Sequence, residues 1–161
     1  MTGIMFPIVD NGEDAAPSAE QPIANDGFFP DVDPAQFARE MRLRDGITPE
    51  RRRRALIAAI ISVGNQLTNY RELRQAQGSA TLADVASAAI DGESRLVQLY
   101  RTAVFSEAKA ILTERYRDAD ITKAGKDQVE DLEPSIGELR RDSVYAVRDL
   151  LGAGRVDVAL I

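Results

Sequence analysis

The stretch Gly92–Arg117, GESRLVQLYRTAVFSEAKAILTERYR, decides the fold, because it is the longest segment that follows one pattern throughout. Its polar residues recur at steps of three and four, which places them in one narrow stripe of a helix. The stripe is Arg95, Gln98, Thr102, Ser106, Lys109 and Thr113. Apolar side chains cover most of the remaining surface, so the helix must be packed on several sides. We expect a central helix, with Asp91 as its N-cap and Glu93 in its first turn.

Start and stop signals on either side predict three further helices. Aspartate or threonine before proline is typical of a helix start, and a glycine often follows a helix end. A serine followed three residues later by glutamate forms a capping box. The expected helices begin at Asp33-Pro34, Thr48-Pro49 and Ser135 (with Glu138), and they end at Gly46, Gln77 (before Gly78) and Gly152 respectively.

The inner faces of these helices follow from the spacing of their apolar residues. In the long second helix a core-facing seam is formed by Leu56, Ile60, Val63, Leu67 and Tyr70. The last helix presents Ile136, Leu139, Ala146, Val147, Leu150 and Leu151. The connector 79–90 contributes Leu82, Val85 and Ile90 to the core, and 118–133 is an exposed polar link. These elements predict an all-α, four-helix bundle-like body over residues 28–154.

Two segments outside this body read as arms. Residues 1–27 are rich in proline and glycine without a sustained period, which predicts an extended N-terminal arm. An apolar group at Ile4–Val9, which includes Phe6, is large enough to dock in a groove on another subunit, whereas Phe28 and Phe29 are expected to anchor the arm to the core. Residues 155–161 alternate weakly, like a short strand without a partner strand in the chain, so this tail is either frayed or added to the edge of another protein's sheet. Its candidate interface residues are Arg155, Val156, Val158, Leu160 and Ile161.

Charge is distributed unevenly along the 161 residues. The net charge is −6, but residues 1–38 carry seven acidic residues and no basic one, so the rest of the chain is +1, from 20 basic and 19 acidic residues. Such an acidic segment is either a solvated tail or an arm that binds a basic surface of a partner.

Composition excludes several kinds of chemistry. Without cysteine or histidine the chain has no disulfide, no thiolate or imidazole metal ligand and no histidine-based triad. Its carboxylates, such as Glu130, Asp131 and Glu133, lie in a polar link without apolar enclosure, so we expect no catalytic residue, cofactor or metal. The longest apolar run, Ala55–Ile61, is far shorter than the ~20 residues of a membrane span. We expect neither a membrane segment nor a signal peptide.

The sharpest charge cluster is Arg51, Arg52, Arg53 and Arg54, just inside the start of the second helix. Basic residues there oppose the helix dipole, at about 0.3–1 kcal/mol each when exposed. The four side chains splay by ~100° per residue, so they cannot all meet one flat partner. This placement predicts a binding role toward an acidic protein surface or phosphates, with the remaining arginines paired to Asp or Glu of their own or a neighbouring subunit.

Seven short stretches occur in the order and spacing of a known family. They are Phe28–Asp33, Met41–Leu43, Tyr70–Glu72, Leu82–Val85, Ile90–Ser94, Glu114–Arg117 and the region from Glu138-Leu139 to Val147-Arg148. Through them the chain resembles the head completion proteins of contractile-tailed temperate phages, over residues 28–161. The first 27 residues match only in being a variable, proline-rich arm.

The resemblance implies a structural virion protein without catalytic residues. It implies a homo-oligomeric ring, expected to be dodecameric, that docks on the portal protein after packaging, extends the channel for double-stranded DNA and offers a surface to downstream neck and tail proteins. The protein would act in the head-tail neck and pass through the host cytoplasm during assembly. On this basis residues 28–154 form an adaptor domain.

A second class stays open beside this one. A small helical nucleic-acid-binding or regulatory protein could use the Arg51–Arg54 cluster, although the nearly neutral body lacks the basic excess of such domains. Strong salt-dependent binding of duplex DNA would favour this alternative. An enzyme ranks third.

Overall fold

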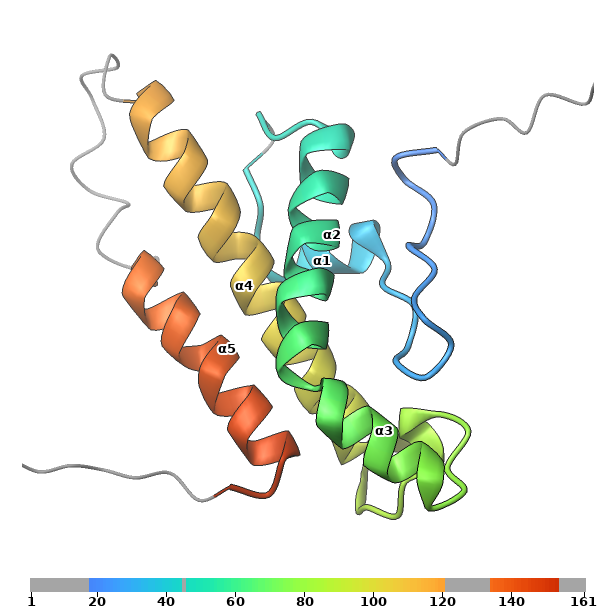
Figure 1. Cartoon of the computed structure of the whole chain (residues 1–161). Helices are drawn as coiled ribbons and strands as arrows, with labels where there is room; N and C mark the ends of the chain where they lie inside the picture. Colours follow the sequence, from blue (N-terminus) through green and yellow to red (C-terminus); the bar gives the residue numbers. More distant parts are fainter. Residues whose placement is uncertain (1–17, 45, 121–133, 154–161) are drawn as a thin grey trace, which may run out of the picture.

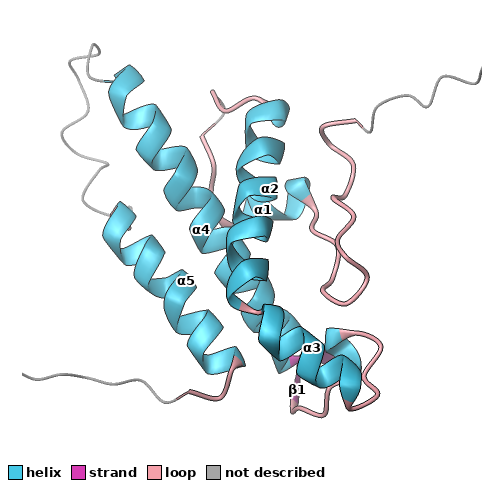
Figure 2. Ribbon diagram, in the orientation of Figure 1, coloured by secondary structure: helices cyan, strands magenta, loops and turns pink. Residues whose placement is uncertain are grey.

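The computed structural model describes residues 18–44, 46–120 and 134–153, and this part of the chain is mostly helical (Figures 1 and 2). Its α-helices are α1 (Pro34–Glu40), α2 (Pro49–Gln66), α3 (Thr68–Ala76), α4 (Arg95–Asp120) and α5 (Ile136–Leu150). Between α3 and α4 lie a 3-10 turn, η1 (Leu82–Asp84), and an antiparallel hairpin of β1 (Ala89–Ile90) and β2 (Glu93–Ser94). The expected helical class is correct, whereas a plain four-helix body is only a rough description of five helices and a hairpin.

The central helix is confirmed as α4. It packs against α2 on one side and α5 on the other, and Figure 1 shows it running between them. The short helix α1 packs on α2, and η1 and β2 contact α4. The molecule is therefore organised around α4, as the apolar surface of this helix requires.

The start of α4 differs from the expectation. Asp91 and Gly92 have positive φ angles of 53° and 76°, and they form the turn between β1 and β2. Asp-Gly is a strong signal for such a hairpin turn, because both residues tolerate this conformation. The N-cap assignment for Asp91 was therefore wrong. Glu93 lies in β2 instead of the first turn, and its carboxylate accepts hydrogen bonds from Arg101 at 2.9 and 2.5 Å.

The long second helix is broken at Leu67 into α2 and α3. The Thr68 hydroxyl donates to the carbonyl oxygen of Gly64 at 3.1 Å, and the Leu67 N–H is shared between the Val63 and Gly64 carbonyls. A side-chain donor and a glycine at one turn are known causes of helix bends. The core-facing seam survives the break, since Leu56, Val63, Leu67 and Tyr70 are buried and Ile60 is partly buried.

The first helix ends at Glu40, six residues before the predicted stop at Gly46. Arg42 adopts the left-handed conformation, with a φ of 48°, and Leu43 N–H donates to Ala38 O at 3.1 Å. This is the hydrogen-bond pattern of a Schellman cap, which usually contains glycine. The left-handed conformation costs a non-glycine residue roughly 1–2 kcal/mol, so the sequence predicted the helix end at the next glycine, Gly46, instead of at Arg42.

Lys109 stabilises the end of α1. Its Nζ donates to the Met41 carbonyl oxygen at 2.9 Å, which satisfies a group that the end of α1 leaves free. Lys109 is only 8% exposed and Ser106 of the same stripe 6%. The middle of the stripe predicted to face water is therefore buried. The sequence pattern could not show this, because the partner of Lys109 is a backbone carbonyl just after α1.

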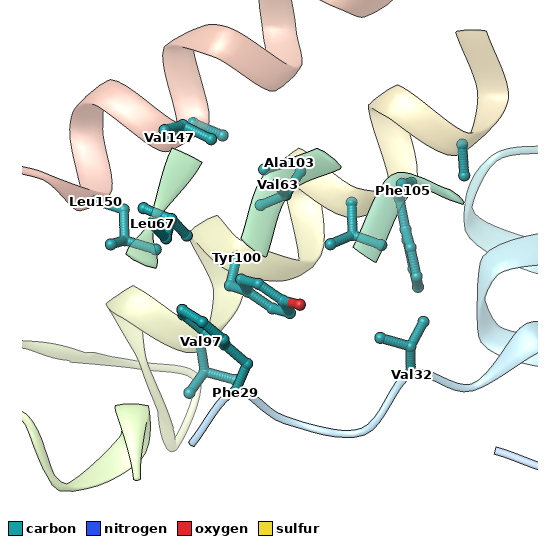
Figure 3. Packing of buried hydrophobic residues seen from close by; sticks show 14 of the residues in the cluster. Phe29, Val32, Val63, Leu67, Val97, Tyr100, Ala103, Phe105, Val147 and Leu150 are labelled. Atoms are coloured by element: carbon teal, nitrogen blue, oxygen red, sulfur yellow. The ribbon is translucent and has the colours of Figure 1, made fainter. Parts of the chain in front are cut away.

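The core joins elements that lie far apart in the sequence (Figure 3). Phe29 stacks on Tyr100 with a centroid distance of 4.6 Å and an interplanar angle of 8°, and Phe28 meets Phe29 edge-on at 5.1 Å. Both phenylalanines are buried, at 2% and 3% exposure. Val147 and Leu150 of α5 enter the same cluster.

Three residues expected in the core lie outside it: Ile90 and Leu151 are exposed, at 52% and 43%, and Ile136 is only partly buried. Ile90 belongs to β1, in which both residues are exposed, and Leu151 is the C-cap residue that follows α5. The capping box of α5 is confirmed, since Ser135 and Glu138 exchange hydrogen bonds of 2.7 and 3.2 Å. The predicted stop at Gly152 is also confirmed, with a φ of 71°.

Candidate interaction surfaces

The arginine cluster lies at the start of α2, as expected, but it is occupied from within the chain. Arg52 forms a salt bridge with Glu20 at 2.8 Å. Arg53 Nη1 donates to the carbonyl oxygens of Ser18 and Gln21, at 3.3 and 2.6 Å. Two of the four arginines therefore hold residues 18–21 of the acidic arm against their own helix, and we call this contact the arm clamp.

The other two arginines are more exposed. Arg51 and Arg54 both present their side chains on the outer part of the first turns of α2. Thr48 caps the helix without a side-chain hydrogen bond to its amides, and Glu50 is the acidic residue of the first turn. Hydrogen bonds, led by those at Glu50 itself and Thr48, lower the pKa of the Glu50 carboxyl, so a negative charge remains at this helix end.

A second set of contacts fixes the following residues, 23–32, to the body. Ile23 and Val32 form a bridge with backbone hydrogen bonds of 2.8 and 3.0 Å. Asn25 Nδ2 donates to the Tyr100 hydroxyl at 2.8 Å and to Pro30 O at 3.1 Å. Burial raises the pKa of Tyr100 to about 12, so the phenol stays protonated at neutral pH. The expected arm 1–27 thus contains a packed section.

Asp26 organises the turn of this section. One carboxylate oxygen accepts the N–H groups of Phe28 and Phe29, each at 3.0 Å, and the other accepts Arg71 Nη1 at 2.7 Å. Burial alone raises the pKa of Asp26, but the hydrogen bonds from Phe29, Arg71 and Phe28 outweigh it and lower the pKa. The ionised carboxylate consequently positions the two phenylalanines that enter the core.

We expect charge reversal at Arg52 and Arg53 to open the arm clamp without unfolding the body. Exposed ion pairs contribute roughly 0–1 kcal/mol, so helix content should persist in the double variant Arg52→Glu, Arg53→Glu. Cleavage after Glu20 by a glutamate-specific protease should become several-fold faster, measured by mass spectrometry. The control is Arg95→Glu with Arg141→Glu, two exposed arginines on α4 and α5. Equal cleavage rates in both double variants would contradict the clamp.

The two ends of the helical body have different surface chemistry. Residue 18 lies beside the end at which α2 begins, whereas α5 finishes at the opposite end, near α3 and the hairpin (Figure 1). This second end carries three exposed apolar side chains, Leu73, Ile90 and Leu151, at 54%, 52% and 43% exposure. The chain therefore leaves its body at a basic end and at an apolar end.

The remaining predictions concern residues of the two arms, metal sites and membrane-spanning helices. Phe6 and the tail residues Arg155, Val156, Val158, Leu160 and Ile161 lie outside the described residues. Within the described ranges, no group of three or more acidic side chains is arranged to hold a metal ion. In the same part of the chain, no helix combines the length and apolar character needed to cross a lipid bilayer.

Comparison with known proteins identifies the family. The model of the phage head completion protein family (GPL) matches residues 23–161. The chain belongs to this family. The match begins at Ile23, the first buried residue of the described structure, and includes the tail 155–161. The resemblance inferred from the seven short stretches is confirmed.

Two relatives of this head completion protein carry the same description. The head completion/stabilization protein of Escherichia phage P2 is 38% identical over 146 residues, which are 90% of this chain and 86% of the relative. The probable head completion/stabilization protein of Haemophilus phage HP1 (strain HP1c1) is 28% identical over 141 residues, 86% of this chain and 91% of the relative. No solved structure gives a significant match. Membership of the family gives the chain a structural role in the phage head and makes it a virion component.

Proposed function

We propose that this head completion protein is the adaptor that docks beneath the portal once DNA is packaged. In this role it extends the DNA channel and provides the attachment surface for downstream neck and tail proteins. The observation that supports the proposal is that the described chain begins and finishes at opposite ends of one helical body (Figure 1). A subunit with two chemically different ends is suited to linking one layer of a neck to the next.

We propose that the copies form a ring, with twelve subunits as the family resemblance implies. Contacts in such a ring are heterologous, so each subunit needs two different faces. The outer faces of α2 and α5 could supply them, because both helices pack against α4 and each leaves apolar residues exposed: Ile57 and Ile61 on α2, Val144 on α5. An acidic lumen would repel DNA phosphates and let the packaged duplex pass without sequence-specific binding.

The nucleic-acid-binding alternative gains no support from the arginine cluster. Arg52 already pairs with a carboxylate, and Arg53 donates to two backbone carbonyls. Phosphate binding at these two side chains would have to displace the arm. A mainly structural virion role therefore remains the better account of the cluster.

We expect one copy of this chain per portal subunit in purified, DNA-filled particles. The reason is that an adaptor ring follows the symmetry of the ring on which it docks. Quantitative mass spectrometry of both proteins measures this ratio, with empty proheads as the control, in which the chain should be depleted. Equal amounts in proheads would contradict docking after packaging. Absence from filled particles would contradict the adaptor role itself.

A further inference from the structure

An open groove lies beside the arm clamp at the start of α2. It has a volume of about 500 Å³ and is lined by Ala19, Glu50, Arg53, Arg54 and Ile57. Beyond it the same helix face continues to Ile61, four residues after Ile57 and therefore one turn further along. Ile57 is 41% and Ile61 57% exposed. The groove thus opens onto an apolar strip that the described residues leave uncovered.

The described chain begins at the rim of this groove. Ala19 is one of its lining residues, and the arm clamp fixes Ser18 through its carbonyl oxygen and Glu20 through its carboxylate. Because consecutive Cα atoms are ~3.8 Å apart, the residues immediately before Ser18 must start next to the groove. The clamp therefore fixes the start of the described chain, to which residues 1–17 are joined, beside this face of the molecule.

The chemistry of residues 1–17 complements that of the strip. Asp10, Glu13 and Asp14 carry negative charge without any basic residue, and the groove presents two arginines, Arg53 and Arg54, against one carboxylate, Glu50. Further out, Ile4–Val9 is the apolar group of the arm. Ser18 follows Val9 by nine Cα–Cα steps, which reach up to ~30 Å, whereas Arg53 and Ile61 are about 12 Å apart along the helix axis.

We propose that Ile4–Val9 of the same chain lies on the outer face of α2, over Ile57 and Ile61, with the acidic residues 10–14 beside Arg54. The arm clamp favours the same chain over a second copy. A segment tethered by a short linker has an effective concentration of about mM at its site, so at lower protein concentration the same chain outcompetes a second copy. The arm covers this α2 face in the free subunit, so a ring neighbour that uses the face must displace it.

Cross-linking tests this contact on the full-length chain, which has no native cysteine. The variant pair is Met5→Cys with Ile61→Cys, and the matched control is Met5→Cys with Val144→Cys, a residue 46% exposed on α5. A short bismaleimide is added at low protein concentration, and mass spectrometry separates intramolecular from intermolecular products. We expect several-fold more intramolecular product for the Ile61 pair. Equal yields in both pairs, or mainly intermolecular product, would overturn the proposal.

A second measurement does not depend on which residue of the arm lies over which residue of α2. In the single variant Met5→Cys, the rate of thiol modification reports how well the arm is covered. Adding Ile57→Asp and Ile61→Asp, both at exposed positions, should raise this rate several-fold at unchanged helix content. An unchanged rate would overturn the proposal. Neither measurement needs a portal, so their failure leaves the adaptor function untouched, and failure of that function leaves this contact standing.

Discussion

Replacing Phe29 with alanine is expected to lower the free energy of unfolding by about 3–5 kcal/mol, the usual cost of truncating a buried phenylalanine. The whole free energy of unfolding of a small domain is roughly 5–15 kcal/mol, so this variant should lose a large part of its stability. Phe29 is 3% exposed, stacks on Tyr100 of α4 and meets Phe28 edge-on. Urea denaturation followed by far-UV circular dichroism measures the loss.

The matched control for this prediction is Leu73→Ala on α3. Leu73 is 54% exposed, and surface substitutions of this kind usually change stability by less than about 0.5 kcal/mol. A similar loss in both variants would show that Phe29 is not the core residue that its stacking indicates.

The size of the Phe29 effect follows from the segments that meet there. The carbonyl oxygen of Phe28 accepts a hydrogen bond from Leu82 N–H at 2.8 Å, which attaches η1 to the arm segment. Phe29 itself contacts α4 through Tyr100. Truncation therefore loosens the arm and the connector together, and a single cooperative loss is expected because these contacts are interdependent.

Local signals in the sequence predicted the helices well. Asp33 accepts from Ala35 N–H at 2.8 Å, and Ser135 and Glu138 form their capping box, because both patterns act within four residues. The apolar coverage of the central stretch identified α4 for the same kind of reason. Such signals fail when a partner from elsewhere in the chain decides the outcome.

Lys109 is the clearest case of that failure. Its position in a polar stripe predicted exposure, but its ammonium group meets Met41 O, 68 residues earlier in the chain. The hairpin was different, because its signal, Asp91-Gly92, was present and was interpreted as a helix start. Aspartate is favoured both at an N-cap and in a hairpin turn, and the pairing of Ala89 with Ser94 separates the two interpretations here.

The arginine cluster was identified from the sequence because basic residues oppose the dipole at a helix start. The sequence allowed its arginines to pair within their own subunit or with a partner, and Arg52 takes the first option with Glu20. The Arg53 contacts were not predictable, since they involve backbone carbonyls of residues 18 and 21, which no side-chain pattern displays. A binding role of Arg51–Arg54 toward another protein stays a prediction.

Deletion of residues 155–161 is expected to abolish binding to the portal while leaving helix content unchanged. We infer that this tail inserts into the portal, as a strand added to the edge of a sheet. The deletion should leave the fold of the body intact, because the hydrogen bonds that cap the C-terminus of α5 are complete before residue 155. Gly152 N–H donates to Asp149 O at 3.2 Å and Ala153 N–H to Arg148 O at 2.9 Å, which completes the cap.

The control replaces residues 155–161 by a Gly-Ser segment of equal length, which keeps the chain length but removes the apolar alternation of Val156, Val158 and Leu160. Both variants should lose portal binding, measured by co-sedimentation with purified portal rings, and both should keep the circular dichroism of the intact chain. Binding by the Gly-Ser variant alone would assign the contact to backbone pairing without side-chain pockets. Binding by the deletion variant would contradict insertion, and would direct attention to Leu73, Ile90 and Leu151, the exposed apolar residues at the same end of the body.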